Sequence, residues 1–312
     1  MSTMKADPDC VPYALNMVLA TARLVTEDEW IHRKVLLCAL ADLAAETDLE
    51  RSAPEIIFSS VQTAYKALGV KDPYENEKAR ANKAVGALEK DFRAELDASD
   101  NRLAAALDLA LQGTILDTGV HDRGTAERLL AAARAQPVAR DDRQELVRTL
   151  ARAEQVVYLL NNAGEAVLDK LFIEEIARGR TVTAVVRHAP ILNDVTLDDA
   201  QALGLGDVEG VEILTTGAPM LGLSLEKAGK QVRDRFAAAD VVVSKGQSNY
   251  ESLARVERDV FFLLRARSVA IARRLGVDQG AAVALGYEPD PAAGPTPPGA
   301  ASRRKKRRAS RG

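Results

Sequence analysis

The feature that most constrains this chain is a short apolar run followed by a polar segment, a pairing that occurs four times in its second half. The apolar runs are residues 156–160, 182–186, 211–214 and 241–243. Runs of this length, rich in valine and separated by segments of helical length, are typical of buried parallel strands that alternate with helices. The pattern predicts the α/β class, with a parallel, doubly wound sheet and right-handed crossovers.

Every apolar run leads into polar side chains or glycines. The first is followed by Asn161-Asn162-Ala163-Gly164-Glu165, the second by Arg187 and Asn193-Asp194, the third by Thr216-Gly217-Ala218-Pro219, and the fourth by Ser244-Lys245-Gly246-Gln247-Ser248-Asn249. The carboxyl ends of parallel strands lie along one edge of a sheet, where open α/β sheets bind their ligands. A carboxylate, carboxamides, a lysine and glycines on one edge suit a metal ion and a phosphate group.

Residues 10–150 have a different texture, because apolar residues recur there at steps of three and four. Leu15, Val18 and Leu19 show this spacing, which is typical of amphipathic helices with one buried face. We expect one helix over about residues 54–68, ended by Gly69, and a long charged helix over about residues 75–96. The chain is therefore divided into an N-terminal helical region, residues 1–150, and an α/β domain that binds metal and phosphate, residues 151–287.

The last segment, residues 288–312, is rich in proline, glycine and alanine and ends in a basic cluster. It cannot bury enough apolar surface to offset its ordering entropy, so we predict a disordered basic tail. Such a cluster can bind polyanions nonspecifically, or it can simply be solvated. Nucleic acid is the less favoured partner, because no aromatic residues are interleaved and no recognised nucleic-acid motif is present.

The composition, 47% hydrophobic and 28% charged, is that of an ordinary soluble protein. Cys10 and Cys38 lack metal-ligand spacing, the N-terminus has no apolar leader, and no apolar run reaches the roughly 18 residues of a membrane span. A cytoplasmic protein with no membrane attachment is predicted. The absence of a G-x-G-x-x-G motif after the first run argues against a nicotinamide enzyme. The sequence leaves the oligomeric state open.

The pair Asn161-Asn162 can be interpreted in two ways. Its side-chain carbonyls could ligate a hard divalent cation at the edge of the sheet, beside the free N–H groups of the following helix. The pair could instead be a strand-to-helix turn with a helix cap. Glu165 closes this segment and is predicted to contribute to substrate binding.

The segment after the second run offers Asp194 as a metal ligand and as the first choice for a catalytic residue. Arg187 directly follows a buried strand and either faces the substrate in the same crevice or forms an ion pair with a nearby acid. Asp198 and Asp199 are better explained as charges in the first turn of a helix that Thr196 or Asp198 caps.

Lys245 and Gly246 follow the fourth run. A lysine held between a buried strand and a glycine supplies a point charge for phosphate, and the glycine allows close backbone approach, although the sequence is not a Walker A motif. A surface position is the alternative for the lysine. We predict that Lys245 is catalytic and also binds substrate, together with Gly246 and Asn249.

Three ordered motifs of the chain resemble those of the damage-control phosphatases, and most closely those of the short prokaryotic branch. They are Asn-Ala-Gly-Glu-x-x-x-Asp at 162–169, Pro-x-x-Asn-Asp-x-Thr-x-x-Asp-Ala at 190–200, and Lys-Gly-Gln-x-Asn-Tyr-Glu at 245–251. Fainter matches, such as Asp72-Pro73-Tyr74 and the glycine-led motif at 113–119, extend the resemblance over about residues 10–285.

The resemblance implies a helical N-terminal region packed on a Rossmann-like α/β/α domain. It implies hydrolysis of phosphate monoesters, often of reactive or damaged sugar phosphates and related metabolites, with Mn²⁺, Co²⁺, Ni²⁺ or Mg²⁺. The positions that hold the metal in the family correspond here to Asn161, Asn162 and Asp194, and Lys245 would hold the phosphate of the substrate.

The chain departs from the family pattern at Asn161, where the family has aspartate. A neutral amide removes one negative charge from the site and weakens its attraction for a divalent cation. The leading hypothesis is thus a metal-dependent phosphatase acting on a small phosphorylated metabolite. The alternative is a catalytically weakened relative that binds a phosphorylated ligand or a partner protein.

Overall fold

A computed structural model describes residues 4–46, 50–116, 120, 122–256 and 258–286. The predicted disordered tail, residues 288–312, lies outside the described residues. The described helices are α1 (Cys10–Val25), α2 (Glu29–Glu46), α3 (Ala53–Leu68), α4 (Glu75–Gly86), α5 (Glu89–Asp97), α6 (Arg102–Gly113), α7 (Arg123–Arg134), α8 (Arg143–Leu150), α9 (Glu165–Ala177), α10 (Leu197–Ala202), α11 (Lys230–Ala238), α12 (Gln247–Leu253) and α13 (Val269–Leu275). The described strands are β1 (Val138–Asp141), β2 (Gln155–Leu159), β3 (Thr181–Val186), β4 (Val211–Thr215), β5 (Val241–Lys245), β6 (Val260–Arg265) and β7 (Ala282–Leu285).

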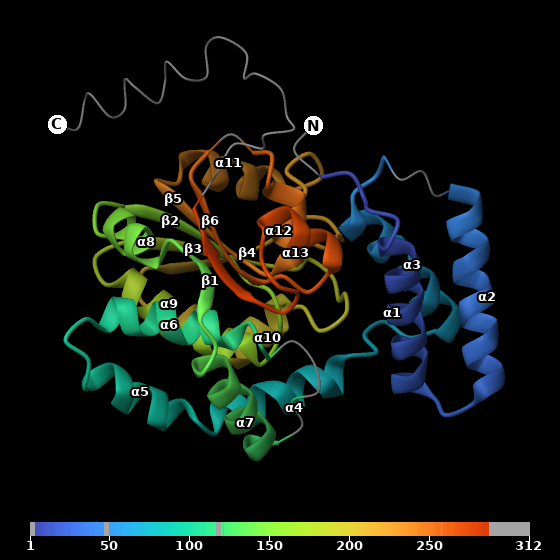
Figure 1. The fold of residues 1–312 in the computed structure, drawn as a ribbon, viewed down its shortest axis with the longest axis horizontal. Helices are drawn as coiled ribbons and strands as arrows, with labels where there is room; N and C mark the ends of the chain where they lie inside the picture. The colour runs from blue at the N-terminus through green and yellow to red at the C-terminus, as the bar shows by residue number, and fades with distance from the viewer. Residues whose placement is uncertain (1–3, 47–49, 117–119, 121, 257, 287–312) are drawn as a thin grey trace, which may run out of the picture.

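In the described part of the chain the strands form one seven-stranded sheet in the order β1-β7-β6-β5-β2-β3-β4 (Figure 1). The five strands from β6 to β4 run parallel, and β7 pairs antiparallel with β6. The chain proceeds outward from β2 to β3 and β4, and then returns to the other side of β2 with β5 and β6. The order therefore reverses between β2 and β5, which is the topological switch point where such sheets bind ligands.

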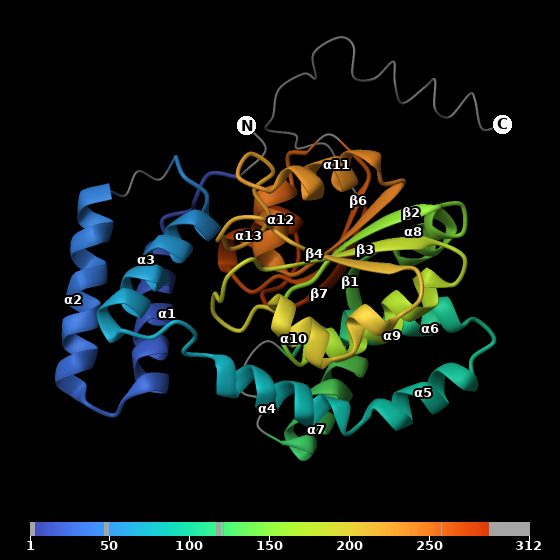
Figure 2. The same ribbon diagram turned by 180° about the vertical axis from the view of Figure 1, so that it is seen from behind.

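Helices cover both faces of the sheet, as Figures 1 and 2 show. Successive residues of β2 point to opposite faces: Tyr158 packs in the core beneath α6 and α9, whereas Val157 and Leu159 pack against α11, α12 and α13. A sheet buried on both faces has continuous apolar strands, which explains the valine-rich runs. The predicted α/β class with a doubly wound sheet is confirmed.

Helices α1, α2 and α3 form a separate group beside the sheet (Figure 1). They enclose apolar clusters of their own, and one of these clusters also takes in Ile191 and Leu221 from the loops at the edge of the sheet. No helix among the described residues combines the length and the apolar character needed to cross a membrane.

The prediction that residues 10–150 are helical is wrong at β1, which pairs with β7 at one side of the sheet. β1 has only four residues, which alternate between half-buried and exposed side chains, so it lacks the apolar run that marked the other strands. The predicted long helix over residues 75–96 is two helices, because the chain turns between Gly86 and Glu89.

The first turn of α10 is capped as the sequence suggests. The side chain of Thr196 accepts from the backbone N–H of Asp199, and the carboxylate of Asp199 accepts from the backbone N–H of Thr196. Asp199 also accepts from Nζ of the buried Lys78 on α4 over 2.6 Å. Asp198 is exposed. The interpretation of Asp198 and Asp199 as helix charges is consistent with this arrangement.

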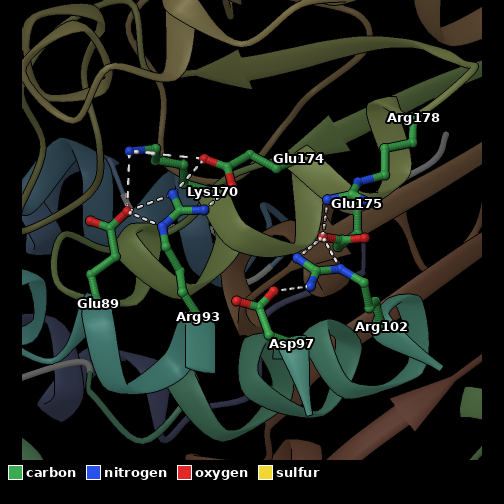
Figure 3. A network of polar contacts seen from close by, with 8 residues as sticks. All are labelled: Glu89, Arg93, Asp97, Arg102, Lys170, Glu174, Glu175 and Arg178. Atoms are coloured by element: carbon green, nitrogen blue, oxygen red, sulfur yellow. Dashed lines mark hydrogen bonds and ion pairs between the residues drawn. The ribbon is translucent and has the colours of Figure 1, made fainter. Parts of the chain in front are cut away.

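Two groups of ion pairs hold α5 and the start of α6 on α9 (Figure 3). In the first, Arg93 donates to Glu174 over 2.7 Å and also contacts Glu89. In the second, Arg102 donates to Oε1 of Glu175 through Nε and Nη2, over 3.0 and 2.9 Å. Because α9 begins at Glu165, these contacts fix the helix whose first turn reaches the carboxyl edge of the sheet.

Replacing Glu175 with alanine should lower the free energy of unfolding by about 1–3 kcal/mol. The substitution removes a buried carboxylate that accepts two hydrogen bonds from Arg102. The matched control is Glu145→Ala, which removes an exposed pair with Arg148 on α8 and should cost no more than about 0.5 kcal/mol. Urea unfolding of the two variants measures both values. Equal losses would contradict the assigned role of Glu175.

Candidate metal and phosphate site

The polar segments that follow β2 and β3 are joined through their backbones. The Val195 N–H donates to the carbonyl oxygen of Asn161 over 2.8 Å. Next to this bond, Asn162 and Asp194 face each other in an isolated antiparallel bridge. Both residues are buried, with exposures of 4% and 3%. Two predicted metal ligands from separate strands are therefore direct neighbours.

Arg187 joins two loops and helix α12 at this edge of the sheet. Its Nε donates to Oδ2 of Asp194 over 2.6 Å, and its Nη1 donates to the carbonyl oxygen of Gly222 over 2.7 Å. Its Nη2 donates to Oδ1 of Asn249 over 3.1 Å. The guanidinium is buried, so the ion pair is shielded from water and sets the orientation of the Asp194 carboxylate. The ion pair with a nearby acid, one of the two alternatives predicted for Arg187, is therefore present in the structure.

Asn249 links the end of β5 to the end of β2. Its side-chain Nδ2 donates to the carbonyl oxygens of Lys245, over 2.8 Å, and of Leu160, over 3.3 Å. Its Oδ1 also accepts a hydrogen bond from Arg187, which directly follows β3. The amide therefore connects the ends of β2, β3 and β5. This buried amide closes the switch point between β2 and β5.

Lys245 is fully buried and points toward α6 and α9. Its Nζ lies 2.7 Å from Oε1 of Glu165 and 2.5 Å from Oδ1 of Asp169, and it donates to the carbonyl oxygen of Ala110 over 2.7 Å. An ammonium group has three hydrogens, and three oxygens surround it here. The surface position considered for Lys245 is therefore wrong, because the buried strand carries the side chain into the core.

The Lys245 cluster contains two carboxylates for one ammonium group. Burial and, to a smaller extent, the nearby charge of Glu165 raise the pKa of Asp169 to about 7, against the opposing effect of Lys245. Burial by itself lowers the pKa of Lys245, but Asp169 and Glu165 outweigh burial and raise it above its usual value. The lysine is therefore charged at neutral pH. Asp169 is the carboxyl group of this cluster that binds a proton more readily than usual.

Gly246 lies directly against the Asn161 amide. Its backbone has φ +80° and ψ 161°, a conformation essentially restricted to glycine. A Cβ at this position would lie 2.3 Å from Cγ of Asn161. The predicted close backbone approach at Gly246 is therefore present, and it is an approach to Asn161.

The loop that carries Asp194 is fastened to the N-terminal helices. Leu192 has φ +48°, an uncommon value for a residue with a side chain, and its N–H donates to the hydroxyl oxygen of Tyr65 on α3 over 2.8 Å. The neighbouring Ile191 is fully buried in the cluster that α1 and α3 share. These contacts hold the loop in a conformation that its own sequence does not favour.

The side chains of Asn161, Asn162 and Asp194 offer amide and carboxylate oxygens, which are the donors that hard divalent cations prefer. They come from two adjacent strand ends that backbone hydrogen bonds fix to each other, so the donor set fits such a cation in kind. Among the described residues no group of three His, Cys, Asp or Glu side chains could hold a metal. A cation here would thus depend on amide oxygens and on oxygens from water or substrate.

The eight predicted site residues lie in one connected set, namely Asn161, Asn162, Glu165, Arg187, Asp194, Lys245, Gly246 and Asn249. Their chemical roles remain predictions. Asp169 and Tyr158 were not predicted as site residues, although the Tyr158 hydroxyl donates to Oδ1 of Asp169 over 2.7 Å. Asp169 lies four residues after Glu165 and hence on the same helix face, a spacing that could have revealed it. Asn82, whose Oδ1 accepts from the Gly164 N–H over 2.6 Å, carries no such signal.

A model of the damage-control phosphatase ARMT1-like domain matches residues 6–283 of the chain. The chain belongs to this family. A damage-control phosphatase from Archaeoglobus fulgidus is 32% identical over 286 residues, which cover 90% of this chain and 99% of the relative. Damage-control phosphatase PH1575 from Pyrococcus horikoshii is 28% identical over 291 residues, which cover 90% of this chain and 98% of the relative.

The fold of the chain is also that of a solved family member. The crystal structure of the DUF89 family protein PH1575 from Pyrococcus horikoshii superimposes with a TM-score of 0.83 at 26% identity, covering 91% of this chain and all of the crystallised chain. The resemblance to the damage-control phosphatases is confirmed, and the match covers the N-terminal helices as well as the sheet.

Proposed function

We propose that this protein is a metal-dependent phosphatase that hydrolyses a small phosphorylated metabolite, such as a sugar phosphate or a related damaged metabolite. The observation that carries the proposal is the convergence of Asn161, Asn162 and Asp194 beside the switch point of the sheet. Family membership supports phosphatase activity. We also propose a cytoplasmic location, which the free thiols of Cys10 and Cys38 support.

In the proposed mechanism, Asn161, Asn162 and Asp194 hold Mn²⁺, Co²⁺, Ni²⁺ or Mg²⁺. A divalent cation bound there supplies Lewis-acid polarisation of a phosphoryl oxygen. Arg187 keeps the Asp194 carboxylate oriented toward the site and adds positive charge at the same edge. Gly246 leaves room for the Asn161 amide, and Asn249 holds the ends of β2 and β5 at a fixed spacing.

Lys245 is proposed to contribute positive charge beneath the site. Its Nζ already contacts three oxygen atoms, so contact with a substrate phosphate would require it to exchange one of these partners. Glu165 and Asp169 offset its charge in the present arrangement, so such an exchange of partners is what would make the positive charge of Lys245 available to a substrate phosphate.

The second candidate is a weakened relative that binds a phosphorylated ligand or a partner protein. Two observations favour it: an amide stands at position 161, and the proposed ligand set contains Asp194 as its single carboxylate. A set with one formal negative charge attracts a divalent cation less strongly than a set with two. The two candidates differ in whether metal addition produces turnover.

Phosphate release by metal-stripped protein tests the proposal. The protein is given a panel of sugar phosphates, with Mn²⁺, Co²⁺, Ni²⁺ and Mg²⁺ added singly. We expect release with at least one metal and none without metal. Folded protein that releases no phosphate with any metal would favour the ligand-binding relative, and equal release with and without metal would contradict the metal dependence.

A further inference from the structure

The orientation of the Asn161 amide is set by a neighbouring carboxylate. Nδ2 of Asn161 donates to Oε2 of Glu165 over 3.1 Å, and the backbone N–H of Asn162 reaches the same oxygen over 3.5 Å. An ionised carboxylate only accepts hydrogen bonds, so it must face the NH₂ end of the amide. The carbonyl oxygen of the amide, which is the end that can ligate a metal ion, is then directed away from Glu165.

Glu165 itself is held by the ammonium group of Lys245. Its Oε1 lies 2.7 Å from Nζ of Lys245, and Lys245 is anchored in turn by Asp169 and by the carbonyl oxygen of Ala110. Glu165 is only 1% exposed, so water does not compete for either of its oxygens. Each oxygen therefore has its own partner: Oε1 faces an ammonium group and Oε2 faces an amide.

Gly246 limits the space in which the Asn161 amide could move. Its α-carbon region approaches the amide so closely that an added Cβ would lie 2.4 Å from Oδ1 and 2.5 Å from Nδ2. This contact is independent of the hydrogen bond to Glu165. The amide is therefore confined by packing on one side and oriented by a carboxylate on the other.

We infer that Glu165 is a positioning residue, which turns the oxygen of Asn161 toward the metal site and is itself held by Lys245, the lysine that Asp169 anchors. The inference rests on the proposed function, because it assigns Asn161 as a metal ligand. Asparagine at position 161 donates a hydrogen bond to Oε2 of Glu165, whereas the aspartate of the family pattern, when ionised, has no hydrogen to donate.

Replacing Glu165 with glutamine tests this arrangement. A glutamine side chain has one acceptor end and one donor end, and Lys245 requires the acceptor. The donor end then faces Nδ2 of Asn161, and the amide of Asn161 must turn over, which takes its oxygen away from the metal site. We expect Glu165→Gln to weaken Mn²⁺ binding about 10- to 100-fold in calorimetric titration of the metal-stripped protein.

The reciprocal double variant, Asn161→Asp with Glu165→Gln, should restore Mn²⁺ affinity at least to the wild-type value. In it the glutamine donates to the new carboxylate while still accepting from Lys245. A role for Glu165 in stability alone predicts no such rescue, so the double-mutant cycle separates the two explanations. Glu175→Gln is the control, because it changes another buried glutamate of α9 that binds arginine, and it should leave Mn²⁺ affinity unchanged.

A second measurement is made without metal. Side-chain amide protons of Asn161 should exchange with water faster in Glu165→Gln than in the wild type, as followed by NMR. Faster exchange with weaker, rescuable Mn²⁺ binding supports the inference. If the wild type binds Mn²⁺ and Glu165→Gln binds it equally tightly, the inference is overturned and the proposed function is not. If the wild type neither binds Mn²⁺ nor releases phosphate, the inference and the proposed function are both overturned.

Discussion

Replacing Asp194 with alanine should reduce metal-dependent phosphate release at least about a hundredfold, because the proposed ligand set loses its carboxylate. The substitution also leaves the buried guanidinium of Arg187 without its ionic partner, and loss of one member of a buried pair costs about 3–5 kcal/mol of stability. Asp194→Asn reduces this second effect, since its amide oxygen can still accept a hydrogen bond from Nε of Arg187 even though the negative charge is lost. The rates of both variants are measured with the metal that gives the wild type its highest activity.

Asp198→Ala is the matched control for Asp194. Asp198 lies in the first turn of α10, four residues further along the chain, and its side chain is exposed. Its removal should leave the rate within about twofold of the wild-type rate, since surface changes of this kind have small effects. Folded Asp194→Asn with full wild-type turnover would show that the metal site has been placed on the wrong residue.

Replacing Gly246 with alanine should lower both stability and activity. Its φ of +80° with ψ of 161° costs a residue with a side chain about 1–3 kcal/mol, and the new methyl group would overlap the Asn161 amide. We expect the free energy of unfolding to fall by about 2 kcal/mol or more, as measured in urea. Phosphate release should fall about tenfold to a hundredfold, because the ligand oxygen is displaced.

Gly69→Ala separates the effect of conformation from that of contact. Gly69 has φ +70° at the end of α3, and a Cβ there would meet nothing within 4 Å. It should cost about 1 kcal/mol of stability and leave phosphate release unchanged. If Gly246→Ala lost no more stability than Gly69→Ala and kept its activity, the packing of Gly246 on Asn161 would be unimportant.

The sheet could be predicted from the chain because β2, β3 and β5 are buried on both faces and carry continuous apolar runs. The edge strand β4 is half-buried but still has apolar residues at three of its five positions. The strands that were missed lack this signal. β1 is short and half exposed, and β7 (AVAL) has alanine at two of its four positions, which is equally common in helices. Both strands form by pairing with segments that are distant in the chain: β1 with β7, and β7 with β6. A local sequence pattern does not reveal such pairing.

The membership of the site was predictable, whereas its internal contacts were not. The rule that ligands bind at the carboxyl ends of parallel strands is enough to bring Asn161, Asp194 and Lys245 to one edge. That Lys245 turns toward the core follows from its position on the same face of β5 as Val241 and Val243. Its partner Ala110 is 135 residues away in the chain, and such a contact becomes visible only once α6 is packed on the sheet.

The hydrogen bond from Leu192 to Tyr65 bears on how separable the two parts of the molecule are. A polypeptide that began after α3 would still contain all the parallel strands and all eight predicted site residues. It would lack the hydroxyl that holds the unfavourable backbone of Leu192, and the apolar cluster that buries Ile191. The sheet and the N-terminal helices are therefore not interchangeable modules. Recombination with another family member would have to exchange α3 and the loop before α10 together.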